Sequence, residues 1–82
     1  MSRAAKILEA ARANPAGLTF GELQSLVTAV GFVLARHNGS HHVYKRSGVV
    51  EIINLQPKGN SAKRYQVEQV LEIVDRYGLV VQ

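Results

Sequence analysis

The five residues Asn38-Gly39-Ser40-His41-His42 lie near the middle of the chain, between two runs rich in apolar residues. Asn-Gly at such a boundary predicts a tight turn between antiparallel strands, because both residues tolerate a positive φ. We expect the turn to deliver Ser40 and His41 onto the first residues of a returning strand. A side chain at the open end of a sheet is held in place by the sheet and is still accessible. Such a position suits a residue that must contact a ligand with fixed geometry.

Outward from this turn, apolar and β-branched runs predict three strands, over residues 32–36, 41–46 and 49–55. Ser47-Gly48 supplies the second turn, and two short connections predict an antiparallel meander. Successive side chains of a strand point to opposite faces of a sheet. His41 and His42 are therefore expected on opposite faces, and the sequence leaves open which of them points toward the helices.

Helices are expected over residues 3–13, from Thr19 to the stop at Gly31, and over residues 62–77. Each has apolar residues at the spacing of one helical face. Thr19 and Glu22 have the spacing of a capping box, in which each side chain bonds the other residue's backbone amide. The order α-α-β-β-β-α predicts an α+β fold, with the helices on one face of a three-stranded antiparallel sheet.

With 82 residues the chain has the size of one small domain, so we expect a single domain over 1–82 with 1–17 as an N-terminal helical extension. The hydrophobic fraction of 46% is typical of a folded chain. There is no cysteine, which excludes disulfides and thiolate metal sites. No segment has the length and hydrophobicity of a membrane span or signal peptide, so we expect a soluble, cytoplasmic protein without membrane contact.

The net charge is +4, and the excess of positive charge lies within residues 31–64, where Glu51 is the one acidic residue. The basic residues of this segment are Arg36, Lys45, Arg46, Lys58, Lys63 and Arg64. A basic segment around the turn favours a polyanion partner, with nucleic acid as the first candidate. The alternative is a solvated basic surface without a partner.

His41 is the candidate catalytic residue, because an imidazole titrates near neutrality and can take or give a proton. With a neighbouring hydroxyl and several cations it can cleave RNA without a metal: the base activates a ribose 2′-hydroxyl and the cations stabilise the transition state. The alternative is a strand histidine that only packs. Ser40 and His41 are poorly placed as nucleophile and base, since adjacent strand residues diverge. A metal site at His37, His41 and His42 lacks acidic residues at ligand spacing.

Two tyrosines accompany the basic segment, Tyr44 and Tyr65. Either ring can stack on a nucleobase, and either can equally be a half-buried tyrosine with its hydroxyl in water. Lys63 and Arg64 stand at the expected start of the last helix, where positive charge opposes the helix dipole. Phosphate contact is the functional interpretation of these cations.

Taken in order, Gly31-Phe32, then Arg36, then Gly39-Ser40-His41-His42 resemble the signature of the HicA toxins. A second set resembles a longer subgroup of that family, at Asn54-Leu55-Gln56, Ala62-Lys63-Arg64-Tyr65-Gln66-Val67, Gln69-Val70-Leu71 and Tyr77-Gly78-Leu79. The resemblance covers roughly residues 20–79, so the first helix lies outside it. Subgroup members often have proline where Arg64 stands, and neither departure touches His41.

The resemblance implies a ribosome-independent mRNA interferase of a toxin–antitoxin pair, with a fold like that of double-stranded-RNA-binding domains. It implies His41 as the catalytic residue, an mRNA substrate, and a HicB-type antitoxin that covers the active face. It implies no metal or organic cofactor, and we expect no DNA contact by this chain alone. The residues expected to bind RNA are Gly39, Ser40, Arg36, Lys45, Arg46, Lys63 and Arg64.

Two other functions fit the same sequence. A non-catalytic RNA-binding module would use the basic face and require only the charge. A purely structural interaction domain would have no affinity for nucleic acid. Only the enzyme requires the imidazole of His41 itself, so substitution of that residue separates the enzyme from the RNA-binding module.

Overall fold

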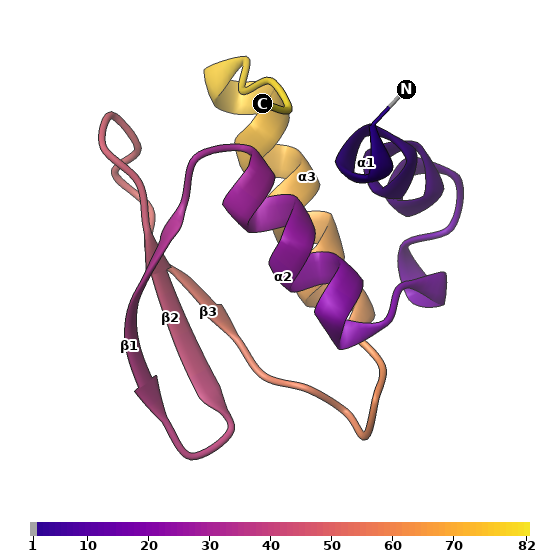
Figure 1. Cartoon of the computed structure of the whole chain (residues 1–82), viewed down its shortest axis with the longest axis vertical. Helices are drawn as coiled ribbons and strands as arrows, with labels where there is room; N and C mark the ends of the chain where they lie inside the picture. The colour runs from indigo at the N-terminus through magenta and orange to yellow at the C-terminus, as the bar shows by residue number, and fades with distance from the viewer. Residues whose placement is uncertain (1) are drawn as a thin grey trace.

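In the computed structural model, which describes residues 2–82, three helices accompany a three-stranded antiparallel sheet of order β1-β2-β3. The elements are α1 (Arg3–Ala13), the 3-10 turn η1 (Pro15–Gly17), α2 (Phe20–Ala29), β1 (Val33–Asn38), β2 (His41–Lys45), β3 (Ile53–Leu55) and α3 (Arg64–Tyr77). Helices α2 and α3 cover one face of the sheet, and α1 lies on the side of this pair away from the sheet (Figure 1). The predicted α+β fold and element order are confirmed.

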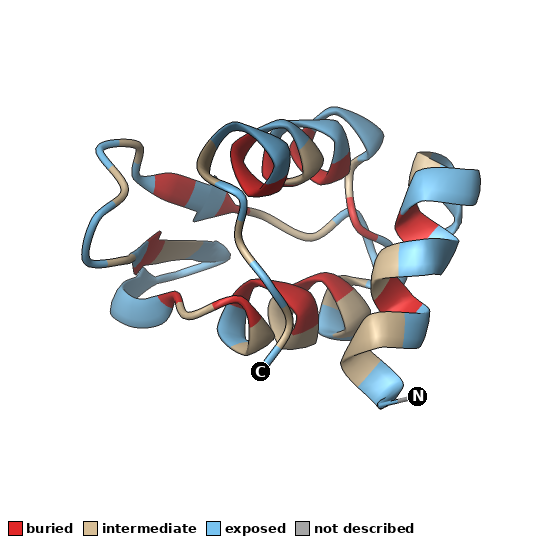
Figure 2. Ribbon diagram, turned by 90° about the horizontal axis from the view of Figure 1, so that it is seen from above, coloured by how far each residue is buried: buried red, intermediate tan, exposed pale blue. Residues whose placement is uncertain are grey.

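The core lies between the helix pair and the covered face of the sheet, where burial of apolar surface supplies the main driving force for folding. The buried residues, red in Figure 2, lie on the inward sides of the helices and on the sheet. They include Leu23, Leu26 and Val27 of α2, Val67, Val70, Ile73 and Val74 of α3, and Tyr44, Ile53 and Leu55 of the sheet.

The start of α2 is tied to the loop that precedes α3. The predicted capping box is present: the Glu22 amide donates to Thr19 Oγ1 at 3.1 Å, and the Thr19 amide donates to Glu22 Oε1 at 2.8 Å. The next amide, of Phe20, donates to the Asn60 carbonyl at 2.8 Å, and the Ala62 amide donates to the Leu18 carbonyl at 3.0 Å. These bonds hold the two helix N-termini side by side.

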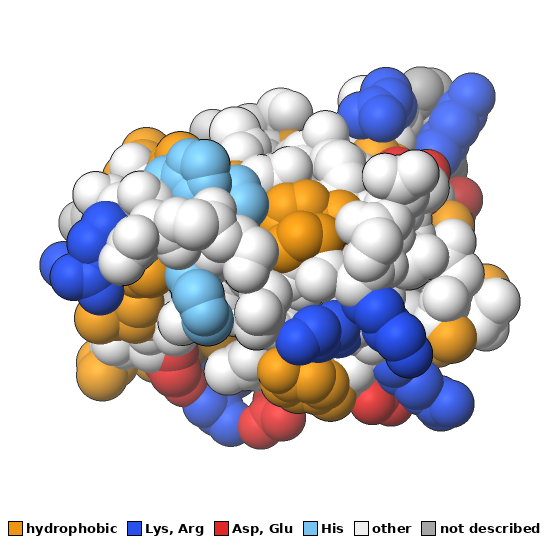
Figure 3. All heavy atoms as spheres, turned by 90° about the horizontal axis from the view of Figure 1, so that it is seen from below, with side chains coloured by type: hydrophobic (Ala, Val, Ile, Leu, Met, Phe, Trp, Pro, Cys, Tyr) orange, Lys and Arg blue, Asp and Glu red, His pale blue; other side chains and the backbone are white. Residues whose placement is uncertain are grey.

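The β1–β2 turn and the starts of α2 and α3 meet at one end of the molecule, the lower end in Figure 1. Figure 3 looks onto this end, where histidine side chains lie with Lys and Arg side chains on either side of them. Part of the positive charge of residues 31–64 therefore lies near the turn in three dimensions (Figure 3).

At the opposite end, Arg46 joins the end of β2 to the end of α2. Its Nε donates to the Val30 carbonyl at 2.8 Å, and its Nη1 donates to the Ser47 carbonyl at 2.7 Å. Gly31 allows this approach: it has φ +105°, and a Cβ built there would lie 2.6 Å from Arg46 Nε. The predicted stop at Gly31 is confirmed, and α2 ends at Ala29.

Helix α1 is docked by packing and by two polar contacts. Ile7 and Ala11 are buried against the core. Arg12 pairs with Asp75 of α3 at 2.7 Å, and Arg3 Nη1 donates to Ser25 Oγ of α2 at 3.1 Å. The Arg12 guanidinium lowers the pKa of Asp75 below its ordinary value. The helix therefore packs on both of its helical neighbours.

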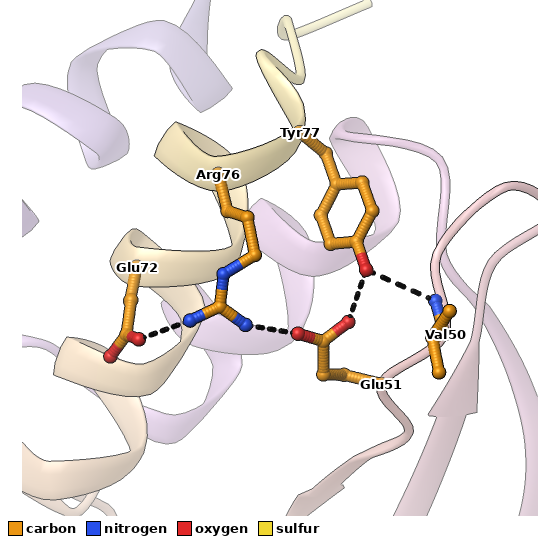
Figure 4. Close-up of polar contacts among 5 residues, drawn as sticks. All are labelled: Val50, Glu51, Glu72, Arg76 and Tyr77. Carbon is orange, nitrogen blue, oxygen red and sulfur yellow. Dashed lines mark hydrogen bonds and ion pairs between the residues drawn. The ribbon is translucent and has the colours of Figure 1, made fainter.

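The third strand was predicted over residues 49–55, and this is wrong for its first half, since β3 comprises only Ile53–Leu55. Val50 is 89% exposed and its amide donates to the Tyr77 hydroxyl at 3.4 Å. The same hydroxyl donates to Glu51 at 2.6 Å, and Glu51 also pairs with Arg76 (Figure 4). The segment leaves the sheet because its polar groups bond the end of α3.

The contacts of Glu51 with Tyr77 and Arg76 favour the ionised form of its carboxyl group. The hydrogen bond from the Tyr77 hydroxyl, then that from the backbone amide of Glu51, and then the Arg76 guanidinium lower the pKa of this carboxyl below its ordinary value. Arg76 bonds Glu72 as well, one helical turn before it, so the guanidinium joins two carboxylates.

Smaller differences concern element ends and the turn. The first strand runs over residues 33–38 rather than 32–36, the second ends at Lys45 rather than at residue 46, and α3 begins at Arg64 rather than at residue 62. Asn38 pairs with His41 as the last residue of β1, so Gly39 and Ser40 form the turn. Gly39 has φ +61°, whereas within residues 2–82 no residue other than glycine has a positive φ. Asn38 does not adopt the positive φ that it tolerates, and the prediction that Ser40 lies on the returning strand is wrong, since β2 begins at His41.

The substitution Gly31→Ala tests the junction of α2 and β2. We expect it to lower the free energy of unfolding by about 1–3 kcal/mol, because alanine is strained at this φ and its Cβ displaces Arg46 from the Val30 carbonyl. Gly21→Ala is the matched control. Gly21 lies in α2 with open space around it, so this variant should be stabilised by about 0.5–1 kcal/mol. Urea unfolding measures both; equal effects would contradict this account.

Candidate active site

Two imidazoles hold the β1–β2 turn in place. The ring nitrogen Nε2 of His37 lies 2.7 Å from the Gly39 carbonyl oxygen, and Nδ1 of His42 lies 3.0 Å from that of Ser40. The two histidines face each other across the strands, with ring centroids 4.1 Å apart and planes at 20°. Imidazole N–H groups donating to both carbonyls make this turn a defined structure.

The stack continues onto α2 and decides which histidine faces the helices. The Phe20 ring meets the His42 ring edge to face, with centroids 5.1 Å apart. The next inward residue, Tyr44, is buried and its hydroxyl accepts from Gln24 Nε2 at 3.2 Å. His42 thus points toward the helices, and His41 points to the open face of the sheet, where it is exposed. The sequence had left this choice open.

A small hollow lies where the open face of the sheet meets the start of α3, and it is lined by His41, Asn54, Gln56, Tyr65 and Gln66. Gln56 follows β3 and ties the hollow together: its Nε2 donates to Ser40 Oγ at 3.2 Å, and its Oε1 accepts from Lys63 Nζ at 3.3 Å. Two residues expected to bind RNA, Ser40 and Lys63, are thereby joined through one amide side chain beside His41.

Gln66 of α3 holds Gln56 and Tyr65 in place. It is the one buried polar side chain within residues 2–82, at 4% exposure. Its Oε1 accepts from the Gln56 backbone amide at 3.1 Å, and its Nε2 donates to the Tyr65 hydroxyl at 3.3 Å. Sequence reasoning missed Gln56 and Gln66 as site residues. The available signal was Gln66 itself, a polar residue in helical register with the buried Val70 and Ile73.

A second, larger and shallow hollow adjoins the first across Tyr65, which lines both. Its cations are Lys58, Lys63 and Arg64, and it also includes Glu68. Lys63 is the N-cap residue of α3 and is half-buried, with no side-chain cap bond. Arg64 is exposed and lies 3.6 Å from Glu68, one helical turn away. Cations at the N-terminus of a helix, where the dipole is positive as well, suit an anion.

The other predicted RNA-binding residues are more dispersed. Arg36 is opposite Val43 and therefore shares the open face with His41. Lys45 also lies on that face, four residues from His41 and thus about 13 Å along the strand. Arg46 lies toward the helices with its guanidinium engaged by the Val30 and Ser47 carbonyls. The structure gathers Gly39, Ser40, His41 and Lys63, with Arg64 adjoining, and separates Arg46 from them.

The three imidazoles differ in what they contact. Within residues 2–82 the His41 side chain has no hydrogen-bond partner, whereas the other two imidazoles bond the turn. Ser40 Oγ accepts from Gln56, so its contact is with an amide rather than with a base.

No group of three or more His, Asp or Glu residues in the described part of the chain is placed to hold a metal ion. None of the described helices could span a membrane.

Comparison with known proteins gives one match. A family model described as HicA toxin of bacterial toxin-antitoxin matches residues 20–75, which is more than half of the chain. The matched stretch begins at the first residue of α2 and ends within the last turn of α3, so it includes the whole sheet and every residue that lines the His41 hollow. Helix α1 and η1 precede it, and Ala16 of η1 lines the second hollow from outside the match. No curated protein and no solved structure shows a significant match. The chain belongs to the HicA toxin family.

Proposed function

We propose that this protein is a metal-independent endoribonuclease that cleaves mRNA, with His41 as its general acid and base. HicA toxins are generally known as mRNA interferases. The observation that carries the proposal is the placement of the three imidazoles. His37 and His42 bond the turn, whereas His41 stands free on the open face and shares a hollow with Gln56, whose Oε1 accepts from Lys63.

The proposed reaction is an intramolecular transesterification of RNA. His41 takes the proton of a ribose 2′-hydroxyl, whose oxygen forms a bond to the adjacent phosphorus while the bond from phosphorus to the 5′-oxygen breaks. The departing 5′-oxygen receives a proton from the imidazolium or from water. The products are a 2′,3′-cyclic phosphate and a 5′-hydroxyl.

The cations beside His41 suit the charge that develops in this step. Lys63 lies one amide side chain away from Ser40, and its ammonium is directed by Gln56. Positive charge placed in advance stabilises a phosphorane-like transition state without reorganisation. Lys63 and Arg64 are proposed to hold the phosphates near the cleaved bond, with Gly39 and Ser40 lining the turn. Arg36 and Lys45 are proposed to contact the RNA chain farther along the open face of the sheet.

Membership of the family implies a cognate antitoxin. We propose that a HicB-type antitoxin covers the open face of the sheet and presents acidic side chains to it. Arg36 and Lys45 lie there among exposed apolar side chains such as Val33 and Ile52. Apolar surface rimmed by charge is typical of a protein-binding face.

The variants His41→Ala and His41→Lys separate the enzyme from an RNA-binding module. We expect both to lose about 10²–10⁴-fold in cleavage rate, because neither has a group that titrates near neutrality. Their unfolding free energy should change by about 1 kcal/mol or less, since His41 is exposed. Cleavage of a labelled RNA and growth of expressing cells are the measurements. A lysine variant that inhibits growth as strongly as the parent, with no RNA cleavage by either protein, would identify a charge-only binding module.

RNA affinity should depend on salt through the cations of the second hollow. Each lost phosphate contact reduces the salt slope for single strands by roughly 0.7, so Lys63→Gln should show that decrease. Lys6→Gln, an exposed substitution on α1, is the matched control and should keep the parent slope. Fluorescence anisotropy over a salt series measures both. A parent that binds with no salt response would refute the polyanion assignment.

Association with the antitoxin should also be steered by charge. Changing Arg36 and Lys45 together to Gln should slow association several-fold at low salt and have little effect at high salt. Stopped-flow mixing with the cognate antitoxin measures the rate, with Lys6→Gln again as control. Unchanged association at low salt would mean that the antitoxin does not use these charges.

A further inference from the structure

Tyr65 combines two properties that rarely occur together: its side chain is exposed and its hydroxyl is tethered. The residue is 62% exposed, yet its hydroxyl accepts from the amide of the buried Gln66 at 3.3 Å. An exposed tyrosine ordinarily leaves its hydroxyl to water. Here the amide of a residue that is itself 4% exposed holds the ring against one edge of the His41 hollow.

The position of Tyr65 is equally specific. It lines both hollows, and thus stands between the imidazole of His41 and the cations Lys58, Lys63 and Arg64. A polynucleotide whose phosphates lie in the cationic hollow and whose sugar reaches His41 passes over this ring. Every nucleobase has a π-face that can stack on such a platform.

We propose that the hollow beside His41 is a nucleobase subsite, in which Tyr65 stacks on the base of the nucleotide whose 2′-hydroxyl is activated. The subsite rests on the proposed ribonuclease function and adds the substrate group that this surface recognises. The ribose that reaches His41 carries its base in the same hollow, where Tyr65 is the aromatic surface. An unpaired base is required, because a base within a duplex has both faces covered.

Asn54 completes the subsite. It lies on β3 opposite Val43, on the open face, and it lines the same hollow. Its side chain is exposed and makes no hydrogen bond with residues 2–82, whereas the Gln56 amide is engaged at both ends. Its amide is therefore free to meet the polar edge of a base that stacks on Tyr65.

The test measures the effect of one protein substitution on the binding of two probes, one with nucleobases and one without. The probes are a six-nucleotide single-stranded 2′-fluoro RNA, which lacks the attacking hydroxyl, and the same backbone without bases. Tyr65→Ala should bind the RNA with bases roughly 5- to 150-fold more weakly than the parent, the range expected for one stacked base. Both proteins should bind the baseless backbone alike. Tyr65→Phe keeps the ring but loses the bond from Gln66, so its affinity for the RNA with bases should lie between those of the parent and Tyr65→Ala.

Fluorescence anisotropy gives the affinities, and circular dichroism shows whether each variant is folded. An equal loss on both probes, or no loss, overturns the subsite. A Tyr65→Ala protein that binds RNA normally but no longer binds the antitoxin also overturns it, and assigns the ring to a protein interface. Because the probes cannot be cleaved, base-dependent loss in a protein that cuts no RNA would keep the subsite and reject the nuclease.

Discussion

The contact between His42 and Phe20 fixes the register on which the candidate site depends. A strand alternates its side chains with a period of two, so placing one imidazole on the helix-covered face commits its neighbour to the other. The His42 ring meets Phe20 at a centroid distance of 5.1 Å and stacks on His37 at 4.1 Å. His41 is consequently exposed at the open face, directly after the turn. A slip of one residue would exchange the two imidazoles and expose Tyr44.

The second constraint is the pair of amide side chains of Gln56 and Gln66, here called the amide relay. It connects the β1–β2 turn, the residue after β3 and the start of α3, which are distant in sequence. Gln56 reaches the β1–β2 turn and the first residue before α3, and Gln66 fixes the backbone of Gln56. A buried amide is tolerated only when it is hydrogen-bonded, and Gln66 uses both ends of its side chain. The relay therefore fixes the position of Lys63 relative to Ser40, the residue before His41.

Local signals in the sequence predicted most of the fold. The capping box at Thr19, the stop at Gly31 and the alternation of His41 and His42 depend on neighbours within a few residues, and all three are present. The strand predicted over residues 49–55 is present only in its second half. Val and Ile favour a strand throughout, but contacts with the end of α3, above all with Tyr77, hold the first half away from the sheet.

The site was predictable only in part, for the same reason. Proximity of Lys63 to Ser40 depends on Gln56, and the burial of Gln66 is decided by helix packing rather than by residue type. Arg46 was predicted to bind RNA because of its charge. In the structure its guanidinium instead bonds the Val30 carbonyl and so connects the end of β2 to the end of α2. Which face of β2 is covered follows from Phe20, a contact between residues 22 positions apart.

The central claim is that His41 activates a ribose 2′-hydroxyl, and the ends of the cleaved RNA report directly on it. Mass spectrometry of the fragments released by the purified protein from a short single-stranded RNA identifies those ends. The account predicts a 2′,3′-cyclic phosphate, or the phosphate formed by its hydrolysis, on one fragment and a 5′-hydroxyl on the other. Fragments that carry a 3′-hydroxyl and a 5′-phosphate would require attack by water and would contradict it.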